Sequence, residues 1–305
     1  MKKLTVLGSV NADHVMQLSH LPKPGETVSS ESYQIQGGGK GANQAVAAAR
    51  MGADITFIAC VGSDAIGQQL VDSFTSVGIN TAGIEPIAGS NTGTAMIFVD
   101  AHGENCIAIS AQANAHLTAD RIEGKKTLIE VADVLLMQLE TPLEGIVYAA
   151  QVAKHAGTQV ILNPAPAAEL PDSLLAMIDL ITPNETEAEH LTGIRVTDQA
   201  GAARACDVLH GKGIAEVVIT LGSRGVWYSS AGVGAHYAGF SVQAVDTTAA
   251  GDCFNGALVA ALLKDSPMSD AITFAQAAAA LSVTRSGAQD SIPALREVVA
   301  FIERH

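Results

Sequence analysis

The sequence is poor in aromatic residues and in basic residues. Aromatic side chains make up 4% of the 305 residues, a composition more typical of helices packed tightly on a sheet than of an aromatic-rich sandwich. Lys and Arg number 17 against 31 Asp and Glu, which gives a net charge of −14. Because nucleic acids and anionic membranes are bound by clustered basic side chains, this charge argues against both kinds of partner.

Cysteines and long apolar runs are also scarce. The four cysteines are far apart, at positions 60, 106, 206 and 253, and no two form a Cys-x-x-Cys pair. This spacing suggests neither a zinc cluster nor a disulfide framework, and it predicts a reducing, cytoplasmic location. The apolar stretch after Lys3 is too short for a signal peptide, and no run of about eighteen apolar residues occurs, so no membrane span is expected.

Short apolar segments alternate with helical patterns along the chain, which is long enough for one large α/β domain spanning residues 1–305. The alternation predicts an α/β fold with a doubly wound, mainly parallel sheet. The expected strands are 4–7, 55–60, 134–139, 159–162, 180–181, 217–221, 226–229 and 235–237. The expected helices include 41–51, 66–77, 251–264, 269–284 and 293–303.

Two other segments predict a small separate sheet. Residues 14–36 are interrupted by Pro22, Pro24 and Gly25 between short β-like pieces, and residues 94–99 and 106–110 read as a hairpin. We expect these segments to form a lid, inserted in the single domain from about residues 13–37 and 94–110.

Asp252 follows a run of small residues at the predicted start of a helix, in the string Asp-Thr-Thr-Ala-Ala-Gly-Asp (246–252). The helix dipole keeps an Asp at this position ionised, which suits a general base that removes a proton from a hydroxyl as its oxygen attacks a phosphate. The neighbouring Gly251 amide suits the charge that develops on the phosphoryl group. An Asp here is equally typical of an ordinary helix cap, but Asp246, at the other end of the string, favours the functional interpretation.

A glycine-rich string, Gly-Gly-Gly-Lys-Gly-Ala-Asn (37–43), precedes another predicted helix. Its glycines permit close approach of a ligand, and Asn43 can hydrogen-bond hydroxyl groups. Positions 37, 39 and 42 also satisfy the dinucleotide pattern Gly-x-Gly-x-x-Ala, so a nicotinamide-dependent dehydrogenase is a second hypothesis. That hypothesis needs an acidic residue about twenty positions later at a strand end, where the chain offers Asp64 only after a Gly-Ser turn.

Other common catalytic motifs do not occur. There is no Gly-x-x-x-x-Gly-Lys-Ser/Thr phosphate loop, no His-Glu-x-x-His and no Gly-x-Ser-x-Gly. The string Asn-Glu-Thr-Glu (184–187) begins a helix with two carboxylates, which suit either an ordinary acidic first turn or the organisation of Mg²⁺ and its waters. Residues 220–225 follow a strand and suit either a nucleotide site or a tight turn.

Together these strings resemble the ribokinase branch of the ribokinase/PfkB carbohydrate kinase family. The two family signatures are Gly-Gly-Lys-Gly-Ala-Asn-Gln (38–44) and Asp-Thr-Thr-Ala-Ala-Gly-Asp-Cys-Phe-Asn-Gly (246–256), and the likeness runs from about residue 3 to 303. Asn-Pro-Ala-Pro (163–166), Thr-Pro-Asn-Glu-Thr-Glu (182–187) and Val-Thr-Arg-Ser-Gly-Ala-Gln (283–289) support this branch. The resemblance implies a three-layer α/β/α fold with a β-sheet lid, phosphorylation of D-ribose at O5 by MgATP, activation by K⁺, and a homodimer formed through the lids.

The resemblance also assigns roles residue by residue. Asp252 is the expected base, and Gly251, Ala250 and Ala249 form the expected anion hole. The expected sugar ligands are Asn11, Asp13, Gly39, Lys40, Gly41, Ala42, Asn43, Glu140 and Asp252. ATP is expected to contact Asn184, Thr220, Leu221, Gly222, Ser223, Arg224, Gly225, Gly251 and Gln276, with Glu187 organising Mg²⁺ through water. The monovalent cation is expected beside Asp246, Thr248, Ser282, Arg285, Gly287 and Ser291.

Two residues depart from the family pattern, and other functions fit the same strings. Thr248 stands where a larger apolar residue is common, and Gln276 stands near the adenine where His or Asn is usual. A kinase of a related pentose or nucleoside, such as a deoxyribokinase, fits the same strings. A non-catalytic sugar-binding regulator would require a damaged base, and Asp252 is intact.

Overall fold

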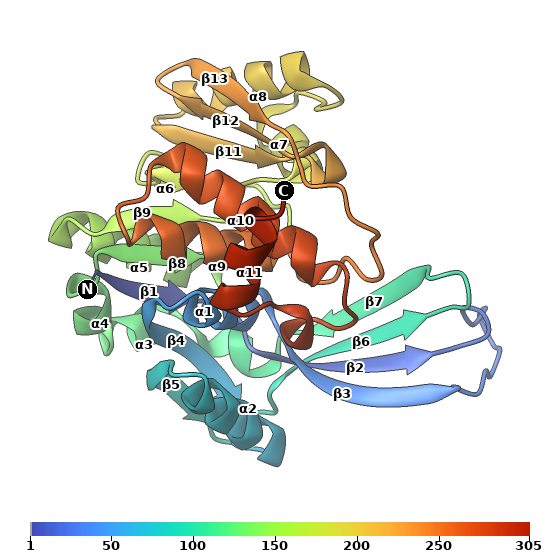
Figure 1. Cartoon of the computed structure of the whole chain (residues 1–305). Helices are drawn as coiled ribbons and strands as arrows, with labels where there is room; N and C mark the ends of the chain where they lie inside the picture. Colours follow the sequence, from blue (N-terminus) through green and yellow to red (C-terminus); the bar gives the residue numbers. More distant parts are fainter. Residues whose placement is uncertain (1) are drawn as a thin grey trace.

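A computed structural model describes residues 2–305 and contains two β-sheets (Figure 1). The larger sheet has nine strands. In their order across the sheet they are β13 (Val233–Tyr237), β12 (Val226–Ser230), β11 (Glu216–Thr220), β10 (Leu180–Ile181), β9 (Gln159–Leu162), β8 (Val134–Met137), β1 (Lys3–Leu7), β4 (Asp54–Gly62) and β5 (Asn80–Ile87). All neighbouring strands pair in parallel except β12 and β13, which join the sheet through antiparallel pairs.

Helices cover both faces of this sheet, because alternate residues of its central strands are buried on opposite sides. One face packs against α1 (Lys40–Arg50), α2 (Ala65–Ser76), α9 (Ala250–Leu262), α10 (Met268–Ser282) and α11 (Leu295–Ile302). The other packs against α3 (Ala119–Glu123), α4 (Lys126–Glu130), α5 (Leu143–Ala156), α6 (Asp172–Leu175), α7 (Glu185–Thr192) and α8 (Gln199–Gly211). Short 3-10 helices are η1 (Gln112–His116), η2 (Gly222–Arg224) and η3 (Gln289–Ser291). The predicted three-layer α/β/α fold class is confirmed.

The segments expected to form the lid make a separate four-stranded sheet that projects from one side of the body in Figure 1. Its strands lie in the order β3 (Ser32–Gly38), β2 (Asn11–Gln17), β6 (Gly93–Val99) and β7 (Asn105–Ser110). The structure therefore contains the expected hairpin, and it extends the first lid strand back to Asn11. Only three residues separate that strand from the end of β1. The base of the lid therefore lies at the carboxyl end of β1, inside the large sheet.

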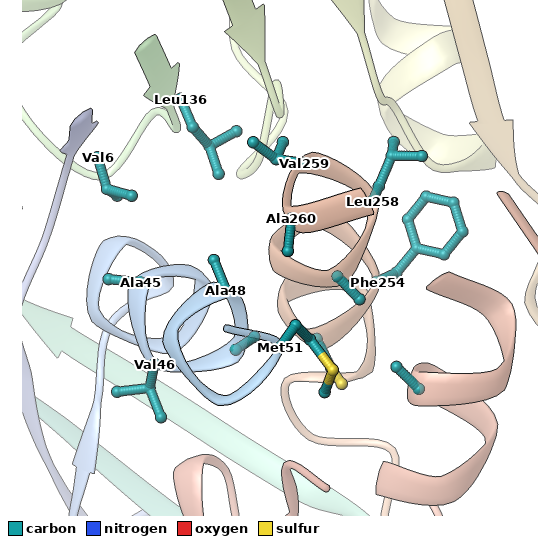
Figure 2. Packing of buried hydrophobic residues seen from close by; sticks show 14 of the residues in the cluster. Val6, Ala45, Val46, Ala48, Met51, Leu136, Phe254, Leu258, Val259 and Ala260 are labelled. Carbon is teal, nitrogen blue, oxygen red and sulfur yellow. The ribbon is translucent and has the colours of Figure 1, made fainter. Parts of the chain in front are cut away.

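Helices α1 and α9 cross closely over the large sheet. Figure 2 shows Ala48 on the side of α1 that faces Ala260 of α9, and Val259 of α9 pointing toward Leu136 of the sheet. At the crossing, a Cβ on Gly256 would lie 2.5 Å from Cβ of Ala47 and 2.6 Å from the carbonyl oxygen of Gln44. Glycine is thus required at position 256. This close approach places the first turn of α9 beside the first turn of α1. The glycine-rich string 37–43 and the string 246–252 therefore lie next to each other.

Candidate active site

The first turn of α1 is packed directly against the end of β1. A Cβ on Gly41 would lie 2.5 Å from the backbone nitrogen of Ser9, and the Ala42 amide donates to the Ser9 carbonyl at 2.9 Å. Ser9 Oγ donates to Oε2 of Glu140 at 2.6 Å, and the Lys40 amide donates to the same oxygen at 3.0 Å. The helix N-terminus and Ser9 therefore hold the Glu140 carboxylate in place.

Asn11 and Asp13 enter the same region from strand β2, and both are buried. Oδ1 of Asn11 accepts from Nδ2 of Asn114 at 2.8 Å, so the Asn11 amide is turned with its own N–H groups away from Asn114. Burial raises the pKa of Asp13 to about 7, helped by the nearby carboxylates of Glu140 and Asp252 and opposed by Lys40.

We expect Asp13→Asn to stabilise the protein at alkaline pH. The folded pKa of Asp13 is raised above its ordinary value, so between about pH 4 and 7 the folded state holds a proton that the unfolded state releases, and stability falls as pH rises. Removing this carboxyl should raise the free energy of unfolding by on the order of 1–2 kcal/mol at pH 8 and little at pH 4. Urea titrations at both pH values measure this, with exposed Asp72→Asn as the control. An equal gain at both pH values would contradict it.

Asp252 lies in the first turn of α9 and is buried where α1 and α9 cross. Nδ2 of Asn43 donates to its Oδ2 at 3.0 Å, and Nε2 of Gln44 donates to its Oδ1 at 2.9 Å. Burial raises the pKa of Asp252, while Lys40 and these two amides oppose the rise. The carboxylate is therefore kept in a dry setting by donors that favour its charged form.

Lys40 is the cation that balances the acidic side chains of this region. Burial would lower its pKa, but Asp252, Glu140, Glu187 and Asp13 outweigh that effect, in this order, and the pKa of Lys40 is raised. The ammonium thus stays charged among four carboxyl groups contributed by four different elements.

The turn before α9 exposes backbone N–H groups beside Asp252. Ala249 is left-handed, with φ 57° and ψ 13°, a conformation that is strained for a residue with a Cβ. The Ala250 amide donates to the Thr247 carbonyl, whereas the Gly251 amide has no acceptor among residues 2–305. Asn255 Nδ2 donates to the Gly251 carbonyl at 2.8 Å and fixes this peptide. The Gly251 N–H is available to an anion.

A cavity of about 410 Å³ runs from this turn to the end of β11. Its wall includes Thr220, Gly222, Ser223, Gly225, Ala250, Gly251 and Gln276, together with the apolar Val226, Phe240, Val242, Phe254 and Val283. Oε1 of Gln276 is buried without a hydrogen-bond partner within residues 2–305. The cavity joins most of the predicted nucleotide residues to the Gly251 amide, and its apolar wall suits a flat heterocyclic ring.

Four of the predicted nucleotide residues do not line this cavity. Asn184 and Glu187 form a capping box at the start of α7, in which each side chain bonds the backbone amide of the other. Burial raises the pKa of Glu187 despite this bond and Lys40. Arg224 pairs with Glu185 and donates to the Thr197 carbonyl, so its side chain is directed away from the cavity. Leu221 is buried beneath the cavity.

The two predicted cation segments lie against each other. Asp246 Oδ2 accepts from the Gly287 amide at 2.8 Å and Oδ1 accepts from the Thr248 amide at 2.9 Å, while the Asp246 amide donates to the Val283 carbonyl. Burial alone would raise the pKa of Asp246, but these hydrogen bonds lower it. Ser282, next to Val283, and Ser291, four residues after Gly287, are both buried. The Arg285 side chain pairs with Glu297.

The model of the pfkB family of carbohydrate kinases matches residues 1–295. The chain belongs to this family. It is 53% identical over 302 residues to the ribokinase of Haemophilus influenzae, which covers 99% of both chains. It is 35% identical over 300 residues to the deoxyribokinase of Salmonella typhimurium, which covers 98% of both. A solved ribokinase of Arabidopsis thaliana, complexed with ribose and ATP, has a TM-score of 0.94 at 31% identity and covers 99% of both chains.

Membership of the PfkB family confirms the predicted kinase and removes the dehydrogenase alternative. The glycine string that imitates a dinucleotide fingerprint follows lid strand β3, whereas that fingerprint follows the first strand of a βαβ unit in the main sheet. No helix within residues 2–305 is both long and apolar enough to cross a membrane.

Several polar residues of this site carry no role in the sequence interpretation. Gln44 and Asn163 lie within strings that the family resemblance quotes, but as residue types they signal no chemistry. Their position is evident only in three dimensions, where they contact Asp252 directly or through one another. The same applies to Gln138, Thr182 and Asn255.

Proposed function

We propose that this PfkB kinase phosphorylates D-ribose at O5 with ATP, giving D-ribose 5-phosphate and ADP, with Asp252 as the general base. The observation that carries this proposal is the pairing of an enclosed carboxylate with a free Gly251 N–H at the mouth of the cavity. Asp252 takes the O5 proton as O5 bonds to the γ-phosphorus and the bond to the ADP oxygen breaks. The Gly251 amide, with Ala249 and Ala250 shaping its turn, stabilises the transferring group.

The sugar binds between the lid and the first turn of α1. Asn11, Asp13 and Glu140 supply polar atoms that point into this region from β2 and from the loop after β8. The glycine string supplies Gly39 to Asn43, whose backbone allows close approach. Ribose and ATP are bound by the Arabidopsis relative named above, which supports this placement.

The nucleotide occupies the cavity with its base toward Gln276 and its phosphates toward Gly251. The apolar wall and the unpartnered Gln276 Oε1 fit an adenine ring with polar edges. Thr220, Gly222, Ser223 and Gly225 complete this side of the cavity, whereas Asn184, Leu221 and Arg224, the other expected nucleotide contacts, do not line it. Glu187 is a hard oxygen donor suited to hold the waters of Mg²⁺, which supplies charge neutralisation on the phosphates.

A monovalent cation, K⁺, is proposed beside the anion hole. The carboxylate of Asp246 and the oxygen atoms of Thr248, Ser282, Arg285, Gly287 and Ser291 form a hard, singly acidic donor set suited to such an ion. The hydrogen bonds that join the Asp246 and Gly287 segments support this assignment. The cation would stabilise the turn that presents the Gly251 amide.

We further propose one domain with an inserted lid, acting as a homodimer in the cytoplasm. The lid exposes large apolar side chains that a second lid would cover, namely Tyr33, Ile35, Met96, Ile107 and Ile109. The cysteines of the described chain are free thiols, one of them exposed, which suits a reducing compartment.

One coupled assay tests sugar and cation together. We expect kcat/KM for ribose to exceed that for 2-deoxyribose roughly 5- to 100-fold, because a site that hydrogen-bonds a hydroxyl leaves polar groups unpaired when it is missing. Replacing K⁺ by Na⁺ should lower kcat. A preference for deoxyribose, which the Salmonella relative makes the main alternative, would overturn the ribose assignment, and indifference to the cation would remove the K⁺ site.

A further inference from the structure

Gln44 contacts the proposed base from a fully buried position on α1. Its Nε2 donates to Oδ1 of Asp252 at 2.9 Å and to Oδ1 of Asn163 at 3.0 Å. Its Oε1 accepts from Nε2 of Gln138 at 2.7 Å. Both N–H groups and the carbonyl of this amide are therefore in use, and the side chain has one satisfied orientation.

The orientation of Gln44 is fixed from both ends. An ionised carboxylate only accepts hydrogen bonds, so Gln44 must turn its Nε2 toward Asp252 and its Oε1 toward Gln138. Gln138 meets that oxygen with an N–H, while its own Oε1 has no partner within residues 2–305. The polar contact that Gln138 makes through its side chain is thus the donation to Gln44.

A parallel arrangement holds the second oxygen of Asp252. Gln289 Nε2 donates to Oδ1 of Asn43 at 3.3 Å, and Asn43 Nδ2 donates to Oδ2 of Asp252. Asn43 is proposed above as a ligand of the sugar, which would draw its amide away from the base. Gln44 has no exposed surface, so it is the donor that Asp252 keeps when the sugar is bound.

The Gln44 contacts also connect the base to the turn that presents Gly251. Asn163 Nδ2 donates to the Thr182 carbonyl at 3.0 Å, Thr182 Oγ1 donates to Oδ1 of Asn255 at 2.5 Å, and Asn255 donates to the Gly251 carbonyl. This series of hydrogen bonds leaves α9 at Asp252 and returns to it at Gly251. The base and the proposed anion hole are therefore positioned by one buried network.

We propose that Gln44, held in its orientation by Gln138, is a positioning residue that keeps the Asp252 carboxylate aligned and ionised for proton removal. This inference rests on the proposed role of Asp252 as base. The charged groups that face Asp252 are Lys40, Asp13, Glu140 and Glu187. Lys40 is the cation among these four groups, and the other three are carboxyl groups that oppose ionisation of Asp252. The uncharged N–H donor of Gln44 therefore adds stabilisation to the ionised carboxylate of Asp252.

The first test is Gln138→Met, which keeps the length of the side chain and removes the donor to Gln44. The substitution removes a buried acceptor that has no partner but also leaves Oε1 of Gln44 without its donor, so these two effects oppose each other and we expect the melting temperature to change little. At the same time kcat should fall roughly 3- to 10-fold, since the Gln44 amide is freed to turn. A purely structural role predicts the reverse, a lower melting temperature with unchanged kcat, and that result would overturn the proposal.

The second test is Gln44→Met, measured as a pH profile. We expect kcat at pH 7 to fall roughly 10- to 100-fold, the loss of one hydrogen bond to a charged group, with sugar KM changed less than about threefold. The acid limb should move to higher pH, because burial without this donor raises the pKa of Asp252 further. Exposed Gln151→Met is the matched control. A wild-type acid limb in a folded Gln44→Met protein would refute the inference.

Failure of this inference and failure of the proposed base are distinguishable. A carboxyl ¹³C NMR titration of Asp252 reports its pKa without turnover, and Asp252→Asn is assayed in parallel. An inactive Asp252→Asn protein together with an unshifted Asp252 pKa in Gln44→Met overturns the positioning role alone. A fully active Asp252→Asn protein overturns the base, and the positioning role with it.

Discussion

Asp252→Asn is expected to lose about 10²- to 10⁴-fold in kcat while the affinities for sugar and nucleotide change little. Asparagine keeps the size of the side chain and one acceptor oxygen, so either Asn43 or Gln44 retains its contact. What disappears is the basic oxygen that we propose takes the hydroxyl proton. The loss should appear in kcat and not in KM, because proton removal occurs only in the transition state.

The same variant should be at least as stable as the wild-type protein. Burial raises the pKa of Asp252, which means that the folded state disfavours its charge, and asparagine removes that cost. Single-turnover rates with saturating sugar, together with melting temperatures, measure both effects. Asp270→Asn is the matched control, since Asp270 is an exposed acid in the first turn of α10. A variant that turns over within threefold of wild type would eliminate Asp252 as the base.

The fold class follows from the sequence because its central strands are short, apolar and separated by amphipathic helices. Residues 159–162 and 180–181 form strands with the predicted bounds. Strand β5 is not predicted, since it carries Gly83 and Pro86 and buries only two of its eight residues, which is enough at the edge of a sheet. The start of strand β2 is not predicted for another reason: Asn11 and Asp13 are polar residues, and they belong to the candidate site.

The candidate site can be predicted from the sequence where the residue type itself indicates a chemical function. Asp252, Lys40 and the glycines stand in strings whose residue types are explicit. The amides of Gln44, Gln138 and Asn163 carry no such signal, because glutamine and asparagine are common at helix surfaces and strand ends. Their roles depend on the crossing of α1 and α9 and on the meeting of three strand ends, which are long-range features.

Lys40→Met is expected to lower kcat/KM about 10²- to 10³-fold, the usual effect of removing a preorganised charge from an active site. Lys40 counteracts the rise in the pKa of Asp252, Asp13 and Glu187 that burial causes. Without the ammonium, the pKa of Asp252 rises further, so less of the base is ionised at neutral pH. The loss should therefore be largest at acidic pH and shrink as pH rises.

The loss of stability in Lys40→Met should grow as pH rises, whereas its loss of activity shrinks. Without Lys40, the folded-state pKa values of these carboxyls lie still further above their unfolded values, so the folded protein binds more protons than the unfolded one and is destabilised as pH rises. Urea midpoints at pH 5 and pH 8 measure this beside the pH profile of kcat/KM. Lys40→Arg retains the charge and should stay within about tenfold of wild type, and Lys212→Met, which removes a surface partner of Asp172, should leave activity unchanged. If Lys40→Met lost activity equally at all pH values and no stability at pH 8, Lys40 would not be the counter-charge of the carboxyl cluster.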